Sequence, residues 1–113
     1  MIAMPWRPKG KAEPKCDVII SEVKFIKGLP KQVEINVKND GDAGCNLKNI
    51  VLIKPSSNQN WTEIQVIWNL STLPPGGTSK TSFRYEWTSG VNYFIKVVTD
   101  KEIETIALEQ APE

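Results

Sequence analysis

Apolar and polar residues alternate along most of this chain, in short segments that polar turns separate. The alternation is clearest from Val33 to Lys38, where three β-branched apolar residues occupy one parity and three polar residues occupy the other. Because successive side chains of a strand point to opposite faces, this segment predicts a strand with one buried and one solvated face. The strand is expected to end at the turn-forming residues Asn39 to Asp42.

The same alternation recurs to the C-terminus and predicts about seven antiparallel strands, with no helical period between them. A change of parity around Ile19 to Ser21 indicates a β-bulge. The strongest break is the segment from Leu73 to Gly77, which is rich in Pro and Gly. The expected strands are Asp17 to Ile26, Gln32 to Lys38, Leu47 to Lys54, Trp61 to Trp68, Thr78 to Trp87, Val91 to Val98 and Glu102 to Leu108.

Regularly spaced turns and short strands are typical of an all-β sandwich. The sandwich domain is expected to span residues 16–108, behind a Pro- and Lys-rich N-terminal arm over residues 1–15 and before a C-terminal tail over residues 109–113. A chain of 113 residues can bury about two-thirds of the surface that its unfolded form exposes, which is enough for one hydrophobic core.

The first two strands are expected to form a hairpin. The residues from Gly28 to Pro30 provide the turn. A hairpin closed there pairs Phe25 with Val33 and Val23 with Ile35. These pairs place apolar residues opposite one another.

The hairpin register brings Cys16 opposite the neighbourhood of Asp42, three residues before Cys45. A disulfide between the two cysteines is therefore within reach, and a loop of this size would stabilise the fold by roughly 3 to 4 kcal/mol. The alternative is two separate thiols. Two cysteines in a chain without histidine cannot complete an ordinary four-ligand zinc site. An oxidised pair would favour an extracellular location.

Charge and hydropathy exclude several classes of partner. The chain carries 14 Lys and Arg residues against 13 Asp and Glu residues, and the basic residues are scattered. Nucleic-acid binding usually needs a concentrated positive field, so no nucleic-acid partner is expected. No segment approaches the roughly 20 apolar residues of a membrane helix, and Met1 to Trp6 does not form a signal-peptide apolar region. Membrane attachment would therefore require an anchor outside this chain.

Candidate catalytic chemistry is sparse. The chain has no histidine, so the usual general base and the Ser-His and Cys-His pairs are missing. The acid pairs Asp40 with Asp42 and Glu102 with Glu104 are better explained as solvated residues of a turn and of an exposed strand face. With Asn39, the first pair could offer oxygens to a weak calcium site, but nothing else completes the shell. We therefore expect no enzyme activity, no cofactor and no metal.

Two sequons, Asn60-Trp61-Thr62 and Asn69-Leu70-Ser71, satisfy the N-glycosylation pattern next to predicted turns. Such short patterns also arise by chance, so Asn60 and Asn69 are candidates only. An oligosaccharide at either position would again indicate a secreted protein.

Several glycines and aromatic residues have structural explanations. Gly76 and Gly77 offer the positive φ that a tight turn after two prolines would need, and Gly90 offers it before the penultimate strand. Trp87 and Tyr93 are expected in or beside the core, with the Tyr93 hydroxyl bonded to the backbone.

Three motifs together resemble a known family: Asn39-Asp40-Gly41 after a strand, the Leu73-to-Thr78 turn, and the pattern F-x-Y-x-W-x-x-G-x-x-Y-x-I-x-V-V-x-D from Phe83 to Asp100. They look like CARDB-type adhesion modules and the related immunoglobulin-like domains of archaeal pilins and archaellum stator proteins, over roughly Asp17 to Ala107. The resemblance implies an immunoglobulin-like β-sandwich that is non-catalytic, lies outside the cell, and serves adhesion, filament building or surface anchoring. The chain lacks the apolar N-terminal helix of pilins and the acidic, Asn-containing tail of CARDB repeats.

Two functional classes follow. The first is a protein-interaction module of a cell-surface or filament assembly, which binds another protein or its own copies through an edge strand or a loop end. The second is a carbohydrate-binding module, suggested by Trp6, Trp61, Trp68 and Trp87, with Trp61 and Trp68 as the candidate stacking rings. Two or more exposed, coplanar Trp rings would favour the second class. A cytosolic scaffold with separated thiols is a third alternative.

Overall fold

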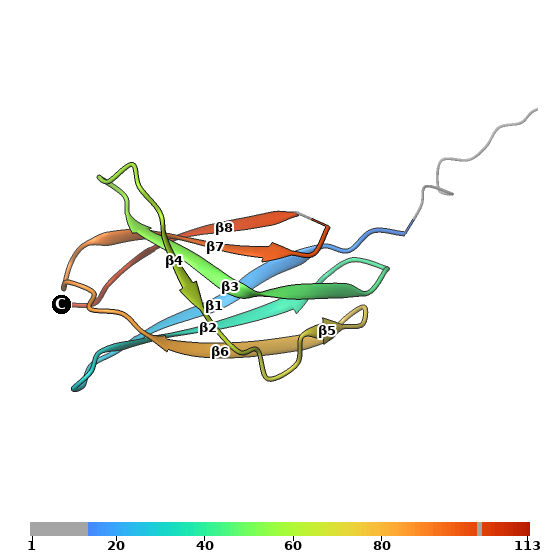
Figure 1. Ribbon diagram of the computed structural model, residues 1–113, viewed down its shortest axis with the longest axis horizontal. Coiled ribbons are helices and arrows are strands. Elements are labelled where there is room, and N and C mark those ends of the chain that lie inside the picture. Colours follow the sequence, from blue (N-terminus) through green and yellow to red (C-terminus); the bar gives the residue numbers. More distant parts are fainter. Residues whose placement is uncertain (1–13, 102) are drawn as a thin grey trace, which may run out of the picture.

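A computed structural model describes residues 14–101 and 103–113. Residues 1–13 of the expected N-terminal arm, which include Trp6 and basic residues, lie outside the described residues. Glu102 lies outside them too. The described chain forms two layers of antiparallel strands (Figure 1). The predicted fold class, an antiparallel immunoglobulin-like β-sandwich, is confirmed.

The described residues form eight strands rather than about seven. They are β1 (Val18–Ile26), β2 (Gln32–Asn39), β3 (Cys45–Pro55), β4 (Thr62–Gln65), β5 (Thr72–Leu73), β6 (Thr78–Arg84), β7 (Asn92–Thr99) and β8 (Glu104–Gln110). The three-stranded sheet has the order β1-β2-β6, and the five-stranded sheet has the order β4-β3-β7-β8, with β5 on β3. The edge strands of the two sheets are thus β1 and β6 in one and β4 and β8 in the other.

The β1–β2 hairpin has the predicted register. Phe25 pairs with Val33 and Val23 pairs with Ile35. The predicted bulge is present as a register shift between Ile20 and Glu22. A bulge allows β1 to keep its apolar residues toward the core although its sequence changes parity.

The core lies between the two sheets and is formed by the apolar parity of each strand. Val33 and Ile35 of β2 and Ile53 and Ile95 of the opposite sheet are fully buried. Burying side chains of this size contributes roughly 1.5 to 3 kcal/mol each. Trp87 is the largest fully buried side chain. The alternation that predicted the strands is therefore also the pattern that closes the core.

The predicted strand from Trp61 to Trp68 is shorter in the structure. β4 stops at Gln65, and the chain then leaves β3 and crosses toward β6. Several hydrogen bonds hold this crossing segment, residues 66–70. Among them, the Thr81 hydroxyl donates to the Ile67 carbonyl at 2.8 Å, and the Trp68 ring N–H donates to the Lys48 carbonyl at 2.9 Å. Tertiary contacts thus replace the strand that alternation alone predicted.

Two further differences concern short elements. β5 pairs with the first residues of β3 and was not predicted, because two residues carry no alternation. The last strand runs from Glu104 to Gln110 rather than from Glu102 to Leu108. Ala111 beyond it is buried, and its N–H donates to the Val91 carbonyl at 2.9 Å.

No helix in the described part of the chain has the length and apolar character that crossing a membrane requires.

Candidate interaction surface

A disulfide joins the two sheets at one end of the sandwich. Cys16, just before β1, is bonded to Cys45 at the start of β3, with 5.2 Å between their Cα atoms. Both residues are buried. Because β1 belongs to one sheet and β3 to the other, the bond fixes the spacing of the layers where the predicted turns gather.

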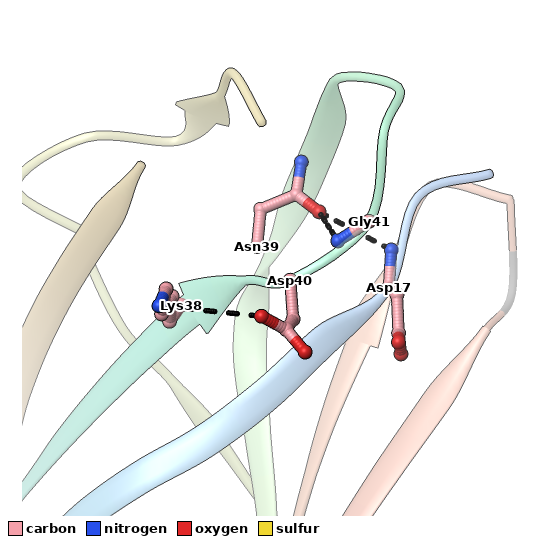
Figure 2. A network of polar contacts seen from close by, with 5 residues as sticks. All are labelled: Asp17, Lys38, Asn39, Asp40 and Gly41. Atoms are coloured by element: carbon pink, nitrogen blue, oxygen red, sulfur yellow. Dashed lines mark hydrogen bonds and ion pairs between the residues drawn. The ribbon is translucent and has the colours of Figure 1, made fainter. Parts of the chain in front are cut away.

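Asn39 organises the same end. Its side chain is fully buried. The amide oxygen accepts hydrogen bonds from the N–H of Gly41 at 2.9 Å and of Asp17 at 3.3 Å, as Figure 2 shows. The amide NH₂ donates to the carbonyls of Ala43 at 2.7 Å and Leu73 at 3.1 Å. A buried polar group is stable only when its hydrogen bonds are made, and Asn39 makes four.

The turn acids act locally in the structure. Asp40 is exposed, and its carboxylate lies 4.0 Å from the Lys38 ammonium (Figure 2). Asp42 accepts a hydrogen bond from the Lys15 N–H at 2.7 Å. Among residues 14–101 and 103–113, no three acidic, His or Cys side chains come together as a metal site would require.

Of the two adjacent turn glycines, only Gly76 has a positive φ, of 79°. The expectation of a positive φ at Gly77 was wrong. A glycine is required there because a side chain would collide with Pro74. A Cβ on it would lie 2.9 Å from Pro74 Cδ and 3.0 Å from the Pro74 carbonyl oxygen. Gly90 has the expected positive φ, of 81°.

Trp87 and Tyr93 lie in the core, and each uses its polar atom. The Trp87 ring N–H donates to the Gln32 carbonyl at 3.0 Å. The Tyr93 hydroxyl accepts a hydrogen bond from the Thr88 N–H at 2.8 Å, which is the expected backbone partner. Phe25 packs edge-on against Trp87 with 5.6 Å between ring centroids. These contacts close the end of the sandwich opposite the disulfide.

The tryptophans among the described residues do not form the surface that carbohydrate stacking would need. Trp68 is only 4% exposed and Trp87 only 1%. The proposed role of Trp68 is therefore wrong, because its ring fills the space under the crossing segment. Trp61 is half-buried, and the ammonium groups of Lys96 and Lys54 lie 4.5 Å and 5.2 Å from its ring centroid.

The two sequons differ in their surroundings. Asn60 is exposed in the turn before β4. The side-chain oxygen of Asn69 instead accepts hydrogen bonds from the Lys80 N–H at 2.6 Å and the Ser79 hydroxyl at 3.0 Å. Asn69 therefore helps to hold the crossing segment against β6. The exposed Asn60 does not contribute to this contact.

A hollow of about 690 Å³ opens between the edge strands β4 and β6. Val66 and Phe83 are buried at its floor, and Ile67 is 85% exposed at its rim. The lining consists of Asn49, Ile64, Gln65, Val66, Ile67, Ser82, Phe83 and Arg84. We call this hollow the β4–β6 groove.

The free backbone of β6 follows one wall of the groove. Asn39 N–H donates to the Gly77 carbonyl and Tyr85 N–H to the Lys31 carbonyl, so the odd-numbered residues of β6 bond to β2. The backbone N–H and C=O groups of the even-numbered residues therefore point away from β2. Both backbone groups of Lys80 are covered by Asn69. Within the described residues, the N–H and C=O groups of Ser82 and Arg84 that point away from β2 have no such partner. These groups face the groove.

Sequence reasoning missed this site. It predicted Thr78 to Trp87 as a strand, and alternation does not tell an edge strand from a central one. One signal was present: Ile67 breaks the alternation of its segment, since it lies between Val66 and Trp68. An apolar residue on the polar parity is a candidate for an exposed contact.

No family model and no curated protein matches this sequence. Solved structures that share its fold include two from the archaellum. The archaellum periplasmic stator protein FlaG from Sulfolobus acidocaldarius superposes with a TM-score of 0.71 over 84% of this chain and 100% of that chain, at 15% sequence identity. The archaellum periplasmic stator protein complex FlaF and FlaG from the same organism superposes with a TM-score of 0.69 over 94% of this chain and 99% of that chain, at 14% sequence identity.

At these identities the likeness concerns the fold. The expected resemblance to archaellum stator domains is confirmed at that level, and these two structures do not bear on the resemblance to CARDB-type modules.

Proposed function

We propose that this chain is a non-catalytic extracellular module that binds another protein in a cell-surface or filament assembly. The observation that carries the proposal is the β4–β6 groove, where an apolar floor lies beside the open backbone groups of Ser82 and Arg84. The fold shared with two archaellum stator structures supports the same class of role.

The partner that fits the groove is an extended segment of another protein. Such a segment can add to β6 as a further strand, because the outward N–H and C=O groups of Ser82 and Arg84 can form a ladder with it. Alternate side chains of the added strand would point toward Val66 and Phe83. These contacts require small or medium apolar side chains at every second position.

The charge of Arg84 indicates one further property of the partner strand. Arg84 is exposed at the groove and forms no ion pair within the part of the chain that the structure describes. Guanidinium groups bind carboxylates in a bidentate geometry. We therefore infer that the added strand carries an acidic residue opposite Arg84.

The extracellular location rests on the disulfide and on the stator structures. Disulfides persist in oxidising compartments and are rare in the cytosol. The structural neighbours are periplasmic proteins by name, and one of them is a complex between two different stator proteins. By analogy, the partner here is a second protein of the same assembly.

Site-specific photocross-linking in the cells that make the protein tests the proposal. A photoreactive residue at Ser82 should give one adduct with an envelope or filament protein. The same residue at Lys24, exposed on β1 of the other edge, should not give that adduct. Identical adducts from both positions, or an adduct with a cytosolic protein, would contradict the proposal.

A pair of variants separates the groove from general surface effects. Ile67→Lys puts a charge at the rim of the groove, and Leu29→Lys puts one at a fully exposed loop position elsewhere. Ile67→Lys should abolish the Ser82 adduct, and Leu29→Lys should leave it intact. Equal yields in the two variants would rule out an apolar contact at the rim.

A further inference from the structure

The edge strand β8 carries exposed apolar side chains that the β4–β6 groove does not include. Ile106 is 53% exposed and Leu108 is 55% exposed. Both lie on the outer face of the five-stranded sheet, since Thr105 and Ala107, which alternate with them, are half-buried toward the other sheet. Exposed apolar residues on an edge strand favour association with another chain.

The backbone of β8 is open along the same residues. Thr99 N–H donates to the Ile103 carbonyl and Ala111 N–H donates to the Val91 carbonyl, so odd-numbered residues of this strand bond to β7. Even-numbered residues alternate with them and direct their N–H and C=O groups away from the sheet. Within the described chain, β8 pairs with β7 alone. Ile106 and Leu108 therefore offer both side chains and backbone groups.

The apolar surface continues onto β7. Phe94 lies opposite Leu108, and Lys96 lies opposite Ile106. The Lys96 ammonium is 3.4 Å from the Glu104 carboxylate, so its charge is compensated beside the apolar residues. The Thr105 hydroxyl also donates to the Val18 carbonyl of β1, which holds this end of β8 in place.

We propose that a second copy of this chain adds to β8, with the two β8 strands antiparallel and a two-fold axis at Ala107. The two five-stranded sheets then become one continuous sheet. This register satisfies the backbone pattern, because even-numbered residues face even-numbered residues. It also leaves the β4–β6 groove open, so it does not depend on the proposed function.

The sequence of β8 is self-complementary in this register. Ile106 faces Leu108 of the other copy twice, which places four apolar side chains together. Glu104 faces Gln110, and Glu109 faces Thr105, so no two like charges are opposite each other. Like charges directly opposite would destabilise the pair. An unrelated partner would have no reason to match both features.

The two neighbouring registers that the backbone allows are less favourable. A shift by two residues sets Ile106 opposite itself and Glu104 opposite Leu108. The opposite shift sets Leu108 opposite itself and Ile106 opposite Gln110. Each of these registers replaces an apolar pair with a mixed one. The three registers bring three different residues to the two-fold axis, which makes them distinguishable.

Variants with one cysteine added to the Cys16–Cys45 pair provide the test. In the proposed register Ala107 meets its own copy as a non-hydrogen-bonded pair about 4.5 Å apart between Cα atoms, within the range that a disulfide spans. Under mild oxidation Ala107→Cys should therefore form a covalent dimer. Ile106→Cys and Leu108→Cys should form little covalent dimer, because the Cα atom of each lies beyond about 7 Å from that of its own copy. A dimer formed mainly by either of these two variants, or by none of the three, would overturn the proposal.

A second measurement needs no cysteine. Strand pairing of this kind buries little area, so the dimer should be concentration-dependent. Sedimentation equilibrium should show masses rising from 12.7 kDa toward twice that value. Ile106→Lys should weaken the self-association by about tenfold or more. Ile67→Lys, in the groove, should leave it unchanged. Equal weakening by both variants, or a monomer at every concentration, would contradict the pairing.

Discussion

The side-chain NH₂ of Asn39, at the end of β2, donates to the carbonyl of Leu73 in β5, at 3.1 Å. The first residue belongs to the three-stranded sheet and the second is attached to the five-stranded sheet. One buried amide thus links the two layers beside the Cys16–Cys45 disulfide.

Replacing Asn39 with Ala should lower the free energy of unfolding by at least about 2 kcal/mol, because four buried or partly buried backbone groups would lose their partner together. Urea unfolding followed by tryptophan fluorescence measures the change. Asn92→Ala, at an exposed position of β7, is the matched control and should change it by less than about 0.5 kcal/mol. Similar losses for the two variants would show that Asn39 does not organise this end.

Removing the disulfide should lower the free energy of unfolding by about 3 to 4 kcal/mol. The sequence separation of 29 residues sets this magnitude through the entropy of the unfolded chain. The double variant Cys16→Ala with Cys45→Ala, compared with the wild-type chain in urea, measures the loss. A reductant should destabilise the wild-type chain and leave the double variant unaffected. A reductant effect on the variant would show another cause.

Gly77→Ala should destabilise the fold more than Gly44→Ala. The new Cβ at position 77 would lie 3.0 Å from the backbone oxygen of Pro74, whereas at position 44 it would meet the Leu73 oxygen at an ordinary 3.6 Å. Forced contacts of the first kind typically cost about 1 to 3 kcal/mol. Thermal unfolding of the two variants measures the difference. Equal melting temperatures would mean that the turn can shift to accept the methyl group.

Stability should fall as the pH rises above 10. Burial, and to a smaller extent the neighbouring Tyr93, raise the pKa of Tyr85 above its ordinary value of 10.0. Above pH 10 the unfolded chain loses the Tyr85 proton before the folded chain does, so ionisation favours unfolding. Urea unfolding at pH 9 and at pH 11 should show a loss that Tyr85→Phe reduces. An unchanged loss in Tyr85→Phe would assign the effect to other groups.

The sequence predicted the parts of the fold that depend on alternation and local turns. The Phe25–Val33 pairing followed from one turn and two matching apolar faces, both of which are local. The core positions of Trp87 and Tyr93 followed from their parity within strands. These elements were predictable because the physical cause of each lies within a few neighbouring residues.

The remaining features depend on contacts between distant segments. Trp68 is buried because the chain crosses from β4 to β6, and no local sequence pattern predicts this crossing. Asn39 looked like an ordinary turn residue, although it bonds to Leu73, 34 residues away. The interaction surfaces were missed because edge strands are defined by what lies beside them. Ile67 and Ile106 did carry a signal, since each is apolar on a polar parity.

In the proposed complex, the open edge of β6 receives a strand from a partner protein. Amide hydrogen exchange at Ser82 and Arg84 can detect this pairing, when it is measured in the isolated protein and in the complex recovered from the cell envelope. Both amides should exchange fast in the isolated protein and become strongly protected in the complex, while Lys24 on β1 is unchanged. A complex in which the Ser82 and Arg84 amides still exchange fast would contradict the account.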